Sequence, residues 1–176
     1  MPGMSEKWTY DDLALLPADG LRHEIIDGVH YVNASLITRH QLILYRLVLA
    51  ISKYLEEHPL VQLFFSPMDI LSQYDLDEHD LKFISDRRHE TVILNYMQGA
   101  PDLVIGILSQ LDIEVNRLSL YERLDASEYW IVDPARDVVR VIRRNTAVIV
   151  ELSSRDTLIS PLFPNLDIDV DRIFAA

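Results

Sequence analysis

Hydrophobic positions recur at helical spacing along residues 36–57, and this pattern predicts one long amphipathic helix. The breadth of its apolar face indicates that the helix packs on a sheet, and His58-Pro59 ends it. Shorter helices are predicted over residues 8–16, where Thr9 is the expected cap, and over residues 111–124. The apolar positions of the long helix are Leu36, Ile37, Leu44, Leu47, Val48, Ile51 and Leu55.

Short apolar runs bounded by turn residues predict strands. The clearest is residues 103–108, which follow Pro101 and are expected to be buried on both faces of a sheet. The pair Asp27-Gly28 predicts a hairpin over residues 21–32. Residues 86–98 are uneven in pattern and are predicted to form a loop with a helical turn. Further strands are predicted over residues 60–66, 68–72, 81–85, 128–133, 138–143 and 147–152.

This order of elements predicts an α/β or α+β fold, in which helices flank a mixed central sheet and a hairpin lies near the N-terminus. One residue departs from the pattern. Gly106 lies inside the strand predicted over residues 103–108, where a glycine costs about 0.5–1 kcal/mol relative to a residue with a side chain. It indicates a bulge, a close approach of another backbone, or a position from which a functional side chain is missing.

Length and composition narrow the possible functions. The 176 residues, 49% of them hydrophobic, are enough for a single domain over residues 1–176. The absence of cysteine excludes disulfides, thiolate zinc sites and cysteine nucleophiles, and we expect a cytoplasmic protein. No apolar run approaches the roughly 20 residues that cross a bilayer, so we expect no membrane association. A net charge of −12 disfavours DNA as a partner, although arginines cluster at Arg87-Arg88 and at Arg140 and Arg143-Arg144.

Three carboxylates stand on or beside predicted strands: Glu24, Asp80 and Asp102. Converging carboxylates bind Mg²⁺, which prefers oxygen ligands and can activate a water molecule. In a chain with 28 acidic residues, the alternative is that these are ordinary surface acids. The six histidines lack zinc-like spacing, and only His79, beside Asp80, is a candidate ligand or proton-transfer group. Phosphate-binding glycine loops and serine-esterase elbows are absent.

In this order, the motifs of the chain resemble the Uma-two family of restriction-endonuclease-like proteins, and the match runs nearly end to end. The resemblance implies a restriction-endonuclease-like core of the PD-(D/E)XK superfamily, with a mixed sheet flanked by helices. The matching residues are Tyr10, Leu16-Pro17 with Gly20, Glu24-Ile25-Ile26-Asp27-Gly28, Arg39-His40, Asp80-Leu81, Gly99-Ala100-Pro101-Asp102-Leu103-Val104, Leu108-Ser109, Tyr121, Glu128-Tyr129-Trp130-Ile131-Val132-Asp133-Pro134 and Ser160-Pro161-Leu162-Phe163-Pro164.

In that superfamily, acids on adjacent strands bind Mg²⁺ and a lysine steadies the attacking water and the phosphate, so that a phosphodiester of DNA is hydrolysed. The resemblance implies that Glu24 and Asp80 would be the metal-binding acids. Arg117 stands where the family's helix usually offers a lysine, and the family's strand acid belongs at Gly106.

The chain departs from the family pattern at these positions. Gly106 removes a metal ligand, Arg117 changes the reach and hydration of the cation, and His79 replaces the usual proline. Asp102 would lie roughly 13 Å from Gly106 along the strand, too far to substitute for the missing acid.

Three functions follow from the resemblance and its departures. The favoured one is an endonuclease-like protein with a degraded site and weak or absent Mg²⁺-dependent cleavage. The second is an active nuclease in which Glu24, Asp80 and His79 hold the metal. The third is a non-catalytic interaction module or homodimer that retains the nuclease fold, since nucleases of this fold often act in pairs.

Overall fold

The computed structural model describes residues 7–16, 22–33, 38–59, 61–65, 69–71, 76–77, 80–85, 92–93, 96–98, 100–108, 126–144, 146 and 149–175. Within these residues the strands form two six-stranded sheets and one two-stranded sheet. The larger core belongs to the sheet with strand order β12-β11-β10-β9-β6-β3, which we call the main sheet. Its strands are β3 (Val61–Phe65), β6 (Leu81–Ser85), β9 (Leu103–Ile107), β10 (Glu128–Asp133), β11 (Val138–Arg143) and β12 (Ile149–Leu152).

The main sheet is mixed, because β9 and β10 run parallel while its other neighbouring strands run antiparallel. A parallel pair needs a long crossover connection, and the chain between these two strands includes residues 109–125, which lie outside the described part. The helix predicted over residues 111–124 falls in this stretch and stays a prediction.

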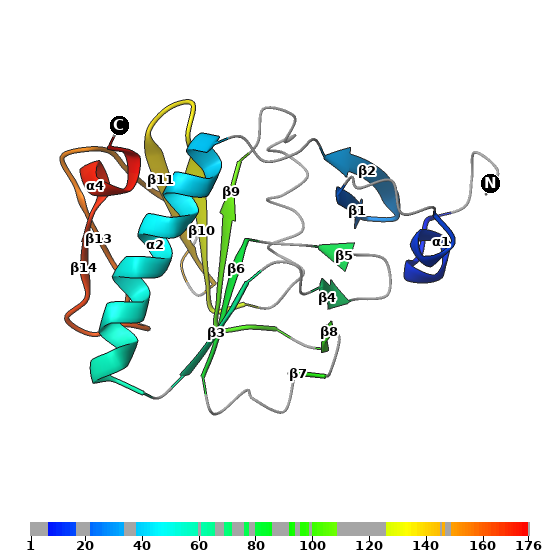
Figure 1. Cartoon of the computed structure of the whole chain (residues 1–176), viewed down its shortest axis with the longest axis horizontal. Helices are drawn as coiled ribbons and strands as arrows, with labels where there is room; N and C mark the ends of the chain where they lie inside the picture. Colours follow the sequence, from blue (N-terminus) through cyan, green and yellow to red (C-terminus); the bar gives the residue numbers. More distant parts are fainter. Residues whose placement is uncertain are drawn as a thin grey trace.

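Helix α2 (Thr38–Glu57) covers one face of the main sheet (Figure 1). Its buried residues His40, Ile43, Leu47 and Ile51 recur at helical spacing and form a single stripe. The aliphatic members of this stripe pack in a core with residues of β6, β9, β10 and β11. The C-terminal helix α4 (Val170–Phe174) packs beside α2, and the guanidinium of Arg46 donates to the carbonyls of the α4 segment.

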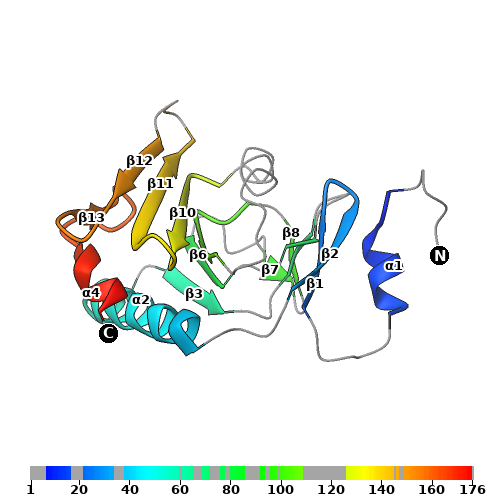
Figure 2. The ribbon, with the colours of Figure 1, turned by 90° about the horizontal axis from the view of Figure 1, so that it is seen from above.

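The opposite face of the main sheet has a second core, formed by Ile84, Val104, Ala126, Tyr129 and Ile131. Tyr31, on strand β2, packs against this core. The second six-stranded sheet, which contains β2, therefore lies on this side, away from α2 (Figure 2). Its order is β2-β1-β5-β4-β8-β7, with β1 (Arg22–Ile26), β2 (Val29–Asn33), β4 (Asp69–Leu71), β5 (Leu76–Asp77), β7 (Val92–Ile93) and β8 (Tyr96–Gln98).

Most predicted elements are confirmed. The long helix is α2, the hairpin is β1–β2 with its turn at Asp27-Gly28, and the predicted strands over residues 60–66, 68–72, 81–85, 103–108, 128–133, 138–143 and 147–152 correspond to β3, β4, β6, β9, β10, β11 and β12. The short N-terminal helix is α1 (Tyr10–Ala14), where Asp12 accepts hydrogen bonds from the hydroxyl and backbone N–H of Thr9, both at 2.8 Å. These two donors, the hydroxyl more than the N–H, lower the pKa of Asp12.

The prediction of a loop with a helical turn over residues 86–98 is wrong, because β7 and β8 lie within that range. These strands have two and three residues, too few to show a period of two. They form because β8 pairs with β4 and β7 pairs with β8. Strand β5 and the two-stranded sheet of β13 (Thr157–Ile159) and β14 (Asp167–Asp169) are equally short and were not predicted.

No helix in the described part of the chain is long and apolar enough to cross a membrane.

Replacing Gly28 by alanine is expected to destabilise the protein. Gly28 has φ +74°, and a Cβ there would lie 2.5 Å from the Cβ of Lys7. The left-handed conformation alone costs a residue with a side chain about 1–2 kcal/mol. Urea denaturation should show at least this loss for Gly28→Ala, while Val32→Thr, at an exposed position of the same hairpin, stays within about 0.5 kcal/mol of the wild type. Equal stability of Gly28→Ala and wild type would contradict this description of the turn.

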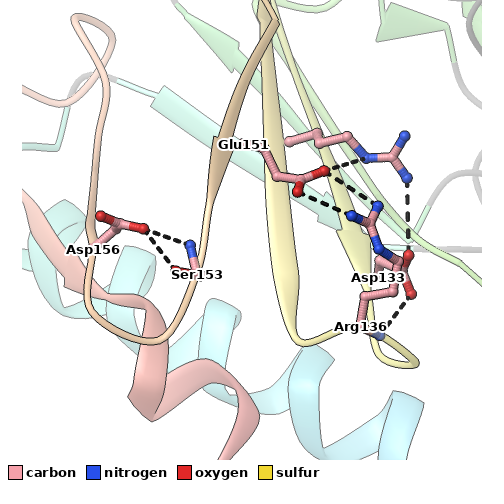
Figure 3. A network of polar contacts seen from close by, with 6 residues as sticks. Asp133, Arg136, Glu151, Ser153 and Asp156 are labelled. Carbon is pink, nitrogen blue, oxygen red and sulfur yellow. Dashed lines mark hydrogen bonds and ion pairs between the residues drawn. The ribbon is translucent and has the colours of Figure 1, made fainter.

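Asp156 is expected to make a pH-dependent contribution to stability. Its carboxylate accepts from the backbone N–H of Ser153 at 2.7 Å and from the Ser153 hydroxyl at 3.0 Å (Figure 3). These bonds, the backbone one first, lower the pKa of Asp156, so the stabilisation is present above the usual pKa and is lost as pH falls through the lowered value. Asp156→Asn should therefore be less stable than wild type at about pH 7, and the difference should narrow toward about pH 3.

The measurement is urea denaturation at both pH values. Ser153→Ala is the matched control, because it removes the hydroxyl and keeps the N–H, and it should retain part of the pH-dependent difference. A difference between Asp156→Asn and wild type that is the same at both pH values would contradict the assignment.

Candidate functional site

Asp80 lies immediately before β6, at the end of the main sheet where β9 finishes. Its side chain is buried, and Oδ2 accepts a hydrogen bond of 2.8 Å from the backbone N–H of Ile107. Its Oδ1 lies 3.2 Å from Nε2 of His40, in the first turn of α2. The carboxylate of Asp80 therefore connects β6, β9 and α2 at one point.

His40 was not among the candidates predicted from the sequence. Only 2% of it is exposed, and its Nδ1 has no hydrogen-bond partner in the described part of the chain. The signal was present in the sequence, because His40 precedes Ile43, Leu47 and Ile51 at the spacing of the buried stripe. A histidine on that stripe could have been predicted to face the sheet.

Gly106 lies in β9, next to the Asp80 site. The antiparallel pairing of β6 with β9 places Leu81 opposite Ile105, so Asp80 and Gly106 come next in the same register. On its other side, Gly106 is paired with Ile131 of β10. All five residues of β9 are buried, and the position where the family resemblance expects an acid has no side chain.

The other residues expected at the site are less completely described. Glu24 lies on β1, opposite Tyr31 of β2, and so belongs to the second sheet rather than to the main sheet; its side chain lies outside the described part. His79 and Arg117 also lie outside the described residues. The structure thus brings Asp80 next to Gly106, and the roles of Glu24, His79 and Arg117 stay predictions.

Asp102 lies at the opposite end of β9 from Gly106. Its carboxylate accepts from the backbone N–H of Ser85 at 2.7 Å. Its own N–H donates to the carbonyl of Phe83 at 2.9 Å, and its carbonyl accepts from the N–H of Glu128 at 3.0 Å. Asp102 therefore ties together the ends of β6, β9 and β10, and its carboxylate is directed to the backbone at that end.

Lys82 is a second charged residue that sequence reasoning missed. It lies in β6, two residues after Asp80, and is 0% exposed. Its neighbours Leu81 and Phe83 belong to the core under α2, and alternation along the strand places Lys82 on the opposite face. Ile84, the next residue of β6 in this alternation, lies on the same face. Val104 of β9, which is paired with Lys82, lies there too.

Asp133, Arg136 and Glu151 (Figure 3) form a polar network with Arg140 of β11. The guanidinium of Arg140, on β11, lies 3.9 Å from both Asp133 and Glu151. Arg136 forms a bidentate pair with Glu151, at 3.0 and 3.2 Å. Asp133 also accepts from the backbone N–H groups of Ala135 and Arg136 in the turn that follows β10.

This network changes the interpretation of the arginine cluster seen in the sequence. Arg140 is buried among acids, and Arg143 lies 3.5 Å from the buried Glu128 and donates to the carbonyl of Ile159 at 2.9 Å. Arg140 and Arg143 thus contact groups of the protein itself, which weakens the case for a basic strip along β11 that could bind a polyanion.

The described residues do not complete a divalent-metal site. Among them, no three His, Asp or Glu side chains lie close enough together to hold an ion. His40 and Asp80 form a pair only, and Oδ2 of Asp80 already accepts from a backbone N–H. Mg²⁺ prefers octahedral coordination with one or two carboxylates and several waters, so a metal here would need ligands beyond this pair.

The fold is shared with a solved structure. A protein from Anabaena variabilis described as a "putative nuclease belonging to DUF820" superposes with a TM-score of 0.79 at 20% sequence identity, over 95% of this chain and 97% of that one. This likeness confirms the predicted restriction-endonuclease-like fold, with its six-stranded mixed sheet flanked by helices.

No match was found among the curated proteins. The family comparison was positive: residues 9–171 match the Uma2 family, whose description is "Putative restriction endonuclease". Because the match spans nearly the whole chain, the protein belongs to the Uma2 family, as its sequence motifs predicted.

Proposed function

We propose that this chain is an endonuclease-like protein whose metal-dependent active site is degraded, with weak or absent cleavage of DNA. The proposal depends on one observation: Gly106 of β9 is the residue after Ile105, which pairs with Leu81, the residue after Asp80. A PD-(D/E)XK nuclease places a carboxylate there to bind the divalent ion that activates water and stabilises charge on the phosphate.

The surroundings of Asp80 support the same proposal. Its carboxylate is used by the backbone N–H of Ile107 and lies beside His40, so a metal would compete with groups of the protein itself. Burial of the site also limits the space for the several waters that Mg²⁺ usually keeps.

Titration with Mn²⁺ by calorimetry, on the wild type and on Asp80→Asn, tests the proposal. We expect no tight isotherm for either protein, and no metal-dependent cleavage of supercoiled plasmid above a control containing EDTA. Asparagine is the appropriate change because its amide oxygen can still accept from Ile107, which protects the fold.

A tight isotherm in the wild type that Asp80→Asn abolishes would overturn the proposal and support the active nuclease, with Glu24 and His79 as the ligands to examine next. Metal-dependent cleavage that Asp80→Asn abolishes would do the same.

The second candidate function is that of a non-catalytic protein that forms a homodimer, and one observation favours it. Leu42, Tyr45 and Leu49 lie on α2 at spacings of three and four residues, and they are 44%, 62% and 55% exposed. This apolar stripe is on the helix face away from the main sheet, and apolar stripes of this kind are typical of helix–helix interfaces. A second copy of the chain would bury the two stripes against each other.

Sedimentation equilibrium is the measurement for this candidate. If the stripe is the interface, the wild type is a dimer at micromolar concentration and Leu49→Lys shifts it toward monomer, because a buried lysine would lie against an apolar surface. Ile159→Lys, an equally drastic change at another exposed apolar residue, should leave the dimer intact. A monomeric wild type would exclude this function.

A further inference from the structure

A pocket of about 460 Å³ lies beside the turn that joins β13 to β14, and the proposed function does not use it. Arg143, the last residue of β11, is one of its lining residues, and the others lie between Ile159 and Asp167. Pockets that hold small ligands usually have volumes of about 300–1,000 Å³, so this one has room for a small molecule.

The pocket is separate from the Asp80 site. Ser160, which lines the pocket, donates to Glu128 at the start of β10. Glu128 is paired with Leu103, the first residue of β9, whereas Asp80 bonds to the residue at which β9 finishes. The pocket is therefore connected to the opposite end of the main sheet, and none of its lining residues belongs to the Asp80 site.

The polar side of the pocket is held in place by Glu128. This carboxylate is 2% exposed and accepts from the Ser160 hydroxyl at 2.7 Å and from the Trp130 indole N–H at 2.9 Å. The guanidinium of Arg143 lies 3.5 Å from it. The Ser160 oxygen also accepts from the backbone N–H of Leu162 at 3.1 Å. Ser160 and Arg143 are thus fixed by the protein itself, which lowers the cost of ordering them around a ligand.

Arg143 keeps hydrogen-bond donors for a ligand. Its side chain is 33% exposed, and Nη2 donates to the carbonyl of Ile159 at 2.9 Å. In the part of the chain that the structure describes, neither Nε, which is buried, nor Nη1 makes a hydrogen bond. A guanidinium has five N–H donors, and their planar arrangement suits a carboxylate. A carboxylate in the pocket could therefore accept from Nη1.

Asp167 gives the same pocket a negative charge. It is exposed, lines the pocket and is paired with Ile159, the residue whose carbonyl accepts from Arg143. Among the described residues, Asp167 and Arg143 do not form an ion pair with each other. A ligand with only a negative charge would meet Asp167, and one with only a positive charge would meet Arg143. A molecule that carries both charges suits the pocket best.

We propose that this pocket binds a free α-amino acid with an apolar side chain. Its carboxylate accepts from Arg143, its ammonium lies at Asp167, and its side chain packs on Pro161 and Leu166, which also line the pocket. A peptide would not suit the pocket equally well, because no residue of a peptide longer than one unit carries both charged groups. The inference goes beyond the proposed function and does not depend on it.

The experiment is calorimetry of the wild type with L-phenylalanine and L-leucine, and with two analogues of L-phenylalanine. Hydrocinnamate lacks the ammonium, and phenethylamine lacks the carboxylate. We expect at least one of the two amino acids to bind, and L-phenylalanine to bind at least about tenfold more tightly than either analogue, because each analogue loses one charged hydrogen-bonding group.

Two variants assign the charged groups. Asp167→Asn should weaken binding of L-phenylalanine several-fold and leave binding of hydrocinnamate no weaker than in the wild type. Arg143→Lys should weaken binding of both, because lysine keeps the charge beside Glu128 but lacks the planar fork. The matched controls are Asp171→Asn and Arg155→Lys, which make the same changes at exposed residues outside the pocket and should bind like the wild type.

The inference is overturned if neither amino acid binds, or if hydrocinnamate binds as tightly as L-phenylalanine. It is also overturned if Asp171→Asn weakens binding as much as Asp167→Asn does. Thermal unfolding of each variant without ligand shows whether it is folded, and if Arg143→Lys is not, Asp167→Asn decides the result alone. Failure of the proposed function would appear instead as tight Mn²⁺ binding or metal-dependent cleavage by the wild type.

Discussion

Strand β9 is buried over its whole length, and this burial constrains the main sheet around it. Backbone groups at the ends of neighbouring buried strands must find partners within the protein, since an unpaired buried donor costs about 1–3 kcal/mol. Asp102 and Asp80 stand at the two ends of β9 and accept from the N–H groups of Ser85 and Ile107. Both acids thus have a structural role that needs no metal.

Charged side chains buried on the face of the main sheet opposite α2 must likewise find partners within the protein. Arg140 is buried near Asp133 and Glu151, which compensate it directly. A carboxylate at position 106 would add a negative charge to a strand with no exposed residue, so it would require a cation close by.

The sequence predicted those elements whose hydrophobic pattern extends over many residues. Helix α2 was evident from its spacing, β9 from its continuous apolar run, and the first hairpin from Asp27-Gly28, whose residues both adopt positive φ. Strands β7 and β8 were missed because so few residues carry no periodic signal, and their structure depends on pairing with β4.

The candidate site was predictable only in part. The resemblance pointed to Asp80 and to Gly106; the structure places Asp80 immediately before β6 and Gly106 in β9, the strand paired with β6. His40 was overlooked because the stripe on α2 was recognised from its aliphatic residues alone. Lys82 was overlooked because alternation in a strand is usually taken to mean that one face is exposed, whereas the second core covers that face here.

Fold and activity depend on different numbers of residues, and this difference decides how Asp80 should be interpreted. The core under α2 involves many side chains, so the loss of one carboxylate leaves the fold intact, while a metal site depends on each of its few ligands. Asp80 would be retained in an inactive protein because it binds the N–H of Ile107. The presence of Asp80 is thus weak evidence for catalysis. The residue at position 106 carries more information about activity, because Gly106 has no side chain that could make such a backbone contact.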